Sequence, residues 1–169
     1  MTRQHFLGIP SILLNLVLFL VAAILMFGIT TTPAVALDYN RENLVEADFS
    51  NRDLTDSEFT KANLRKANLS NSNLQRVSFF ATNLEAANLE GADLSFATLD
   101  SARFVRANLK NAILVGAFAS NARFEGANIE GADFTDVLLR RDIQDKLCLT
   151  ASGTNSKTGR ETRETLFCD

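Results

Sequence analysis

Histidine, proline and glycine-rich loops are scarce in this 169-residue chain, and their scarcity removes whole classes of function. The one histidine, His5, stands in the N-terminal segment, and the chain has only two cysteines. Histidine is the commonest general base and a thiolate the usual sulfur nucleophile, so we do not expect an enzyme. No Gly-rich phosphate loop or transition-metal ligand spacing occurs, so we expect neither a cofactor nor a metal centre.

The charge balance argues against nucleic-acid binding. Beyond Ala36 the chain carries 16 basic and 20 acidic side chains, without a basic cluster. Affinity for nucleic acid depends on Lys and Arg groups that neutralise phosphates. We therefore expect a protein partner rather than a nucleic acid.

Residues 1–36 have the features of a Sec-type secretory signal. A short basic head is followed by an apolar run at residues 16–29 ("LVLFLVAAILMFGI"). Ala34 and Ala36 then provide small residues at the two positions that an export peptidase reads, which predicts cleavage after Ala36. The alternative is an uncleaved membrane anchor, because residues 12–29 are just long enough to span a bilayer.

Apolar residues recur at every fifth position through the middle of the chain. Of the 20 positions from Leu44 to Leu139 in steps of five, 19 hold Leu, Phe or Ile, and the exception is Ala119. Two residues before these positions, 13 of 20 residues are Ala; one residue before, 12 of 20 are Asn or Asp. A step of five keeps residues neither on one helix face nor on one strand face. The chain must therefore turn once per five residues, and its coils must stack to bury the apolar positions.

This pattern, as in "AANLEGADLSFATL" (86–99), resembles the pentapeptide-repeat family. The resemblance implies an all-β solenoid over residues 37–141, a right-handed, four-sided β-helix of about five coils with four pentapeptides in each. Stacking at intervals of 20 would align an outer ladder of amides, which we interpret as structural: Asp48, Asn68, Asn88, Asn108 and Asn128. A second outer column is interpreted as solvated face residues rather than a calcium site: Asp53, Asp93 and Asp133.

Residues 142–169 are predicted to cover the open end of the array, because uncovered edges invite further strands. Asp136 is expected to N-cap a helix. The apolar face of that helix would consist of residues at i, i+4 and i+8: Leu139, Ile143 and Leu147. Thr158 and Glu161 have the spacing of a capping box and would open a second, short helix.

The two cysteines, Cys148 and Cys168, flank this last segment. An even pair in an exported protein is typical of a disulfide, with separate thiols or a redox-regulated bond as alternatives. The bond would close a 21-residue loop, worth about 3 kcal/mol on the chain-entropy model. The export signal, the array and "LCLTASGTNSKTGRETRETLFC" (147–168) also resemble the lumenal pentapeptide-repeat proteins of cyanobacteria and plant thylakoids, which have a disulfide-linked helical cap. That resemblance implies the thylakoid lumen, or the periplasm, of a cyanobacterium.

The segment 111–124 departs from the repeat pattern. Three apolar residues are expected to point outward there, beside the small centre Ala119: Ile113, Val115 and Phe118. Leu138 follows one coil beyond Phe118, so an apolar patch is predicted. Three interpretations stay open: burial beneath the cap, a distortion that lets Phe118 fill the space beside Ala119, and a docking patch for another protein. Two further outward aromatics are interpreted as isolated: Phe80 and Phe96.

The function that we expect is a non-enzymatic interaction or scaffold role, linked to photosynthetic complexes or their assembly. One alternative is a redox-responsive regulator switched at Cys148 and Cys168. Another is a gyrase-binding DNA mimic, as in some cytoplasmic relatives, but the 15 acidic and 10 basic residues of 37–139 and the export signal disfavour it. We expect membrane contact only through an uncleaved signal segment, and a monomer or a weak homodimer formed through residues 37–43.

Overall fold

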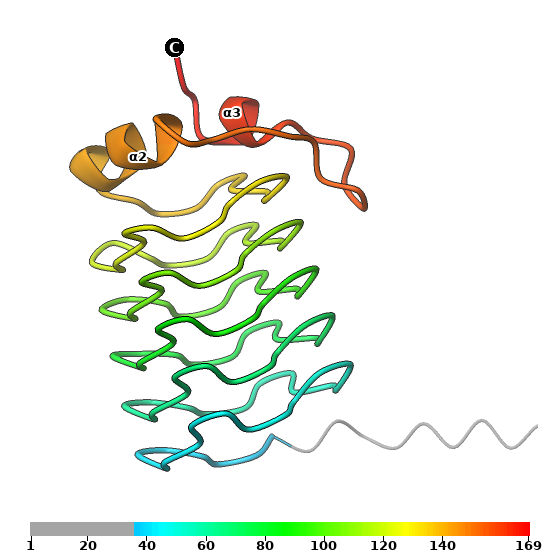
Figure 1. The fold of residues 1–169 in the computed structure, drawn as a ribbon, viewed down its shortest axis with the longest axis vertical. Coiled ribbons are helices and arrows are strands. Elements are labelled where there is room, and N and C mark those ends of the chain that lie inside the picture. The colour runs from blue at the N-terminus through cyan, green and yellow to red at the C-terminus, as the bar shows by residue number, and fades with distance from the viewer. Residues whose placement is uncertain (1–35) are drawn as a thin grey trace, which may run out of the picture. The chain divides into compact units, whose positions relative to one another are not determined.

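The computed structural model describes residues 36–169, which form a stack of turns and a C-terminal cap (Figure 1). The predicted export signal, with Ala34, lies outside the described residues. Ala36 is exposed and has no regular structure, and cleavage after it stays a prediction. Within residues 36–169, no helix has the length and apolar character needed to cross a membrane.

The shaft is built from single parallel β-bridges whose register never changes. The first bridge joins Asp38 to Glu58, the last joins Phe118 to Leu138, and a bridge begins at every fifth residue between them. Four pentapeptides therefore complete each turn of the solenoid. The bridges are isolated pairs, and no longer strand forms among residues 36–169. The right-handed sense of the coil stays a prediction.

Each pentapeptide contains one bridge and one tight corner. The N–H of Leu64 donates to the carbonyl of Asn83 in the next turn at 2.8 Å, and the N–H of Ala67 closes the corner on the carbonyl of Leu64 at 3.0 Å. Between them, Lys66 has a φ of 60°, in the left-handed region. This corner turns the chain inward once per five residues, although left-handed φ is unusual for non-glycine residues.

The core is a set of stacked apolar columns. The four centres of one turn have no exposed surface: Leu84, Leu89, Leu94 and Leu99. Phe104 stacks on Phe124 one turn above, with ring centroids 5.2 Å apart and ring planes 5° from parallel. Each such side chain contributes about 1.5–3 kcal/mol when it is fully buried, so the columns supply most of the stability of the shaft.

The first unit of the shaft, at Tyr39, lies within the predicted solenoid of residues 37–141 but before the 20 counted positions, which begin at Leu44. Tyr39 lies in phase with Leu44, and its N–H donates to the carbonyl of Glu58 at 2.7 Å. Its ring stacks on Phe59 with centroids 4.8 Å apart and meets Phe49 edge-on. Tyr39 stands five residues before Leu44 and so fits the period, but the pattern considers only Leu, Phe and Ile at the inward positions.

The predicted ladder of amides is confirmed as structural. The Nδ2 of Asn68 donates to Oδ1 of Asp48 at 3.1 Å, and the same bond recurs at each step upward. The remaining three donor and acceptor pairs are Asn88 to Asn68, Asn108 to Asn88, and Asn128 to Asn108, at 3.3, 3.1 and 3.3 Å. These bonds link neighbouring turns on one side of the shaft.

The cap contains two short helices, α2 (Arg141–Cys148) and α3 (Thr162–Thr165). The predicted N-cap at Asp136 is wrong, because Asp136 occupies a shaft corner with a φ of 55° and α2 follows Arg140 without a side-chain cap. Leu139 packs against the core before α2 begins, as the last in-phase residue of the shaft. The array thus continues to residue 139 and delays the helix.

The predicted capping box before α3 is also wrong. Glu161 precedes α3 in an extended conformation, held by an antiparallel bridge to Thr154, and no side chain caps the helix. The Thr158 N–H instead donates to Oδ1 of Asn155 at 3.0 Å. The capping-box spacing thus falls within a hairpin-like loop rather than at a helix start.

Candidate interaction surface

Phe118 is exposed on the side of the shaft, with 53% of its surface accessible. It bridges Thr98 below and Leu138 above in unbroken register. Burial beneath the cap and insertion beside Ala119 are therefore both wrong as accounts of Phe118. The physical reason is the pleat: Phe118 directly precedes an inward centre, so its side chain must point outward.

A small backbone departure does follow Phe118. Within residues 36–139, Asn121 is the one residue at the corner position without a positive φ. Its N–H donates to the side chain of Asp100 at 3.0 Å instead of to a carbonyl of a further turn. The change is confined to this corner and leaves Phe118 outside.

Phe96 packs on the turn above it, at a position two residues before Phe118, rather than projecting alone. Gly116 has a φ of +66°, and a Cβ there would lie 2.7 Å from the ring of Phe96, so the ring covers Gly116. Phe96 is 57% exposed and Leu138 is 56% exposed. We call the surface formed by Phe96, Val115, Phe118 and Leu138 the apolar face. The sequence contained a sign of the packing of Phe96, because Phe96 and Gly116 are 20 residues apart, which is one turn of the solenoid.

Ile113 lies on the next side of the same turn, across the corner at Gly116. It is half-buried and bridges Asp93 and Asp133. Val115, at the corner itself, is also half-buried. The predicted trio is therefore split, with Phe118 exposed and Ile113 half-buried directly below Asp133, which the C-terminal loop contacts through Arg160.

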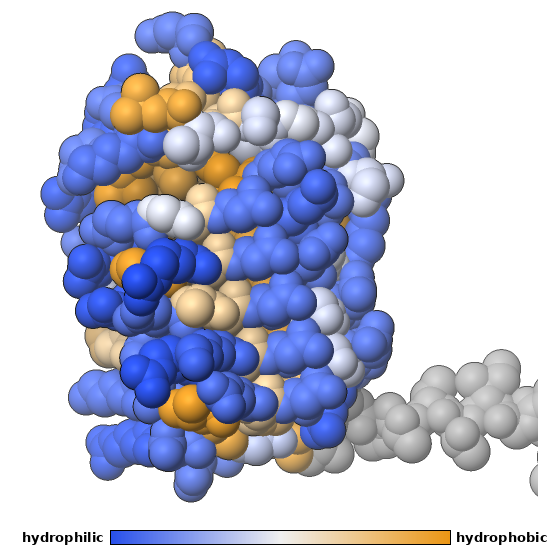
Figure 2. Space-filling view, viewed as in Figure 1, coloured by the Kyte–Doolittle hydropathy of each residue, from blue (hydrophilic) through white to orange (hydrophobic). Residues whose placement is uncertain are grey.

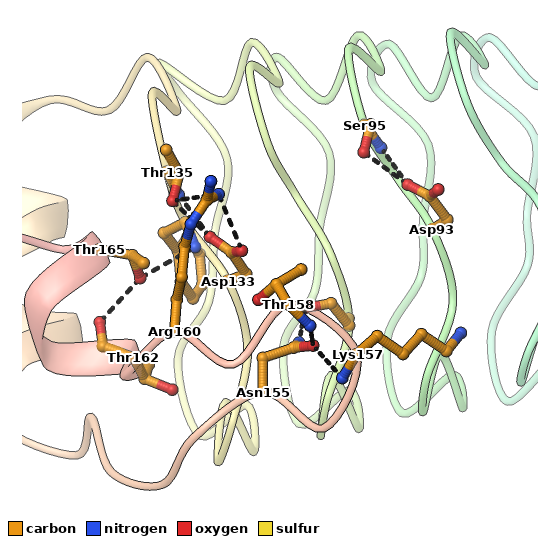
Figure 3. A network of polar contacts seen from close by, with 12 residues as sticks. Asp93, Ser95, Asp133, Thr135, Asn155, Lys157, Thr158, Arg160, Thr162 and Thr165 are labelled. Atoms are coloured by element: carbon orange, nitrogen blue, oxygen red, sulfur yellow. Dashed lines mark hydrogen bonds and ion pairs between the residues drawn. The ribbon is translucent and has the colours of Figure 1, made fainter.

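That loop, residues 149–161, folds back along the shaft, and Figure 3 shows the polar side chains that hold it. Asn155 is 1% exposed, and its Nδ2 donates to the carbonyls of Gly131, Asn111 and Ala112 at 2.8, 3.2 and 3.3 Å. Lys157 reaches further down, and its Nζ donates to the carbonyl of Gly91 at 2.7 Å. We call the docked loop with these contacts the clamp. The sequence pattern did not predict it, because nothing in a turn-rich segment indicates where it docks.

Arg160 completes the clamp through Asp133. Its Nη1 lies 3.3 Å from Oδ2 of Asp133 and donates to Oγ1 of Thr135 at 3.1 Å. Asp133 has no exposed surface, so the prediction that it is a solvated face residue is wrong. Burial opposes its ionisation, but hydrogen bonds from the hydroxyl and the N–H of Thr135, together with Thr158 and the positive charge of Arg160, outweigh this, and the pKa of Asp133 is lowered.

Cys148 and Cys168 form a disulfide that joins the end of α2 to the C-terminus. Both cysteines are half-buried in an open hollow. Leu149 and Phe167 flank them with 84% and 76% of their surfaces exposed. The bond closes a ring that contains the whole clamp.

Among residues 36–169, no group of three or more His, Cys, Asp or Glu side chains could hold a metal ion. Three side chains of the apolar face, Phe96, Phe118 and Leu138, are large, apolar and more than half exposed, which suits contact with another apolar surface.

Comparison with known proteins gives a consistent result. The family model for pentapeptide repeats matches residues 43–79, 78–112 and 102–141. Thylakoid lumenal 15 kDa protein 1, chloroplastic, of Arabidopsis thaliana is 56% identical over 39 residues, which are 23% of this chain and 17% of that protein. A crystal structure of a pentapeptide repeat protein from the Arabidopsis thaliana thylakoid lumen is 39% identical, with a TM-score of 0.63, over 80% of this chain and 88% of that one. One from the cyanobacterium Cyanothece is 32% identical, with a TM-score of 0.52, over 53% and 61%.

Proposed function

Because this chain belongs to the pentapeptide-repeat family, we propose that it is an exported, non-enzymatic interaction module of the thylakoid lumen or the periplasm. Its architecture would be a right-handed shaft of about five coils. Support for the compartment comes from the secretory pattern of residues 1–36 and from the lumenal origin of the similar Arabidopsis protein. Sequencing the N-terminus of the protein purified from cells tests export: a start at Leu37 supports it, and an intact Met1 argues for an anchor.

In this proposal the apolar face binds the partner, and the main observation in support is the exposure of Phe118. Three large apolar side chains on a polar shaft are each more than half exposed: Phe96, Phe118 and Leu138. Fully burying a large apolar side chain contributes about 1.5–3 kcal/mol, and a partner that covers the exposed half of each of these three gains about half of that for each. The partner class is a protein with a complementary apolar surface, such as a lumen-exposed part of a photosynthetic complex or an assembly factor.

The test is photo-cross-linking from the apolar face in cyanobacterial cells. A photoreactive phenylalanine analogue replaces Phe118, and a matched variant carries it at Asn88 in the ladder on another side of the shaft. A defined second polypeptide should cross-link from Phe118 and not from Asn88, and Leu138→Ser should reduce its yield. Equal products from both positions, or products only within residues 140–169, would count against the apolar face.

A redox-responsive regulator is the second candidate, favoured by the half-buried disulfide between two exposed apolar side chains. Reduction would open the ring that holds the clamp, which would uncover the surface beneath residues 149–161. The double variant Cys148→Ser with Cys168→Ser stands in for the reduced state. If that variant cross-links from Phe118 as the oxidised protein does, the regulatory hypothesis fails while the interaction module stands.

A further inference from the structure

The cap replaces the next turn of the solenoid on part of the shaft only. The N–H of Gly131 donates to the carbonyl of Ser152 at 2.8 Å, and the N–H of Phe134 donates to Oγ1 of Thr165 at 3.1 Å. One turn below, the equivalent N–H of Asn111 donates to the carbonyl of Glu130 at 2.9 Å, as part of the regular stacking of turns. Cap atoms thus satisfy one of the two stacking N–H groups on each of these sides, while those of Ile129 and Asp136 have no acceptor among residues 36–169.

The side at Phe124 has no such replacement. One turn below, the N–H groups of Phe104 and Arg106 donate to the carbonyls of Arg123 and Glu125 at 2.7 and 2.9 Å. The equivalent N–H groups of Phe124 and Gly126 have no acceptor among residues 36–169, because the chain that would form the next turn has become α2. Two backbone donors therefore face the space beneath α2.

Two backbone acceptors accompany them. The carbonyls of Ala102 and Ala107 accept the N–H groups of Arg123 and Asn128, both at 2.9 Å. Their equivalents one turn higher are the carbonyls of Ala122 and Ala127, and these accept no hydrogen bond from residues 36–169. The edge thus presents acceptor, donor, donor, acceptor in the order that one turn of this solenoid presents to the next.

The same four residues line a hollow of about 220 Å³ between the last turn and α2. Ile143 and Leu147 of α2 contribute apolar surface opposite Phe124, and Figure 2 shows hydrophobic surface exposed just beneath the cap. Three charged side chains also line the hollow: Arg123, Glu125 and Lys146. The Nε of Arg123 lies 3.4 Å from Oε1 of Glu125. The open backbone groups and apolar walls of the hollow therefore lie beside charges of both signs.

We propose that this hollow is a binding site for an extended peptide segment of a partner protein, which adds to the edge at Phe124 and Gly126 as a further turn would. The alternation of donors and acceptors fits a peptide backbone, whereas a small anion could use only the two N–H groups. Main-chain bonds supply affinity in such β-augmentation, and the apolar walls select an apolar side chain. The site lies on the side of the shaft adjoining that of Phe118 and is independent of the apolar face.

The experiment pans the exported, disulfide-bonded protein against a library of random linear octapeptides. An enriched peptide is synthesised, and hydrogen exchange of the Phe124 and Gly126 amides is followed by NMR. We expect exchange of both amides to slow at least tenfold when the peptide binds. Methylating alternate backbone nitrogens of the peptide should abolish binding, because the peptide is held by hydrogen bonds from its backbone N–H groups to the open carbonyls of the last turn.

Thr150→Trp is the blocking variant, since Thr150 is exposed and lines the hollow. Leu149→Trp is its matched control, because Leu149 is the neighbouring residue and faces the hollow at the disulfide instead. Affinity should fall at least tenfold in the first and stay unchanged in the second. If Thr150→Trp does not fold, Lys146→Trp blocks the same rim.

Three outcomes would overturn the proposal. One is the absence of any enriched peptide, and another is equal affinity for the two tryptophan variants. The third is protection of the Phe124 and Gly126 amides by acetate alone, which would make the hollow a site for small carboxylates.

Discussion

Asn155→Ala should loosen the cap more than any other single change in the clamp. Its Nδ2 donates to three shaft carbonyls, at 2.8 Å to that of Gly131. Its Oδ1 accepts the N–H groups of Lys157 and Thr158 at 2.9 and 3.0 Å. The variant thus removes both the docking of the loop and the internal bonds that shape it.

The expected loss is roughly 2–4 kcal/mol of local stability. An amide has two protons, so about two strong donor bonds and two acceptor bonds disappear, each worth about 1 kcal/mol net. Since 1.4 kcal/mol is about tenfold in an equilibrium constant, opening of the cap should become about 30-fold more frequent or greater.

Native-state hydrogen exchange measures this opening directly. Exchange of the Gly131 amide, which is hydrogen-bonded to Ser152 of the loop, reports opening of the cap. Exchange of the Leu89 amide, which is hydrogen-bonded to Asn108, reports opening of the shaft. Exchange should accelerate at Gly131 and stay constant at Leu89, because solenoid turns depend mainly on their neighbours. Ser156→Ala, at an exposed neighbour, is the control. If Asn155→Ala and Ser156→Ala give the same exchange at Gly131, the clamp does not hold the cap and the reasoning is refuted.

Three further perturbations have defined outcomes. Gly131→Ala should destabilise the protein more than Gly126→Ala in urea unfolding, although the two glycines have nearly the same φ, +69° and +70°. A methyl group at Gly131 would lie 2.5 Å from a neighbouring side-chain oxygen, whereas one at Gly126 would lie 3.5 Å from its nearest atom. Equal losses of stability would mean that φ alone sets the cost. Because its pKa is lowered from the ordinary value of 3.8, ionised Asp133 contributes its full stabilisation above pH 3.8, and this contribution is lost as the pH falls through the lowered pKa. The free energy of unfolding of Asp133→Asn should therefore depend less steeply on pH below 4 than that of the wild type. Parallel curves for the two proteins would contradict this role of Asp133. Replacing Cys148 and Cys168 with Ser should lower the free energy of unfolding by about 3 kcal/mol at most, and a rise in stability would show that the bond strains the cap.

The shaft could be predicted from the sequence because a single local rule repeats. Every unit buries one large side chain and turns at one corner, so the period of five predicts both the inward positions and the register between turns. The same rule contains Tyr39, which was left out only because aromatic residues other than Phe were not counted. Periodic burial is thus a strong predictor even where no standard strand or helix forms.

The cap could not be predicted to the same depth, because its contacts connect segments far apart in the chain. Asn155 contacts a carbonyl 44 residues away, and Lys157 contacts one 66 residues away. Local signals such as the capping-box spacing at Thr158 were overridden by these contacts. The docked loop also contacts Asp133 through Arg160, so the burial of Asp133 had no signal in the local sequence.

A binding role for Phe118 is supported by comparison with the residues at the equivalent position of other pentapeptides. Asparagines that directly precede a centre hold neighbouring turns together, as Asn88 does through its bond to Asn68. A phenylalanine there gives up such a bond, worth about 1 kcal/mol. It gains little burial in return, since 53% of its surface stays exposed, and Leu138 directly above it is 56% exposed. Neither hydrogen bonding nor packing within residues 36–169 therefore accounts for two consecutive apolar residues in this column. A partner that covers both would recover the apolar burial that the shaft itself forgoes.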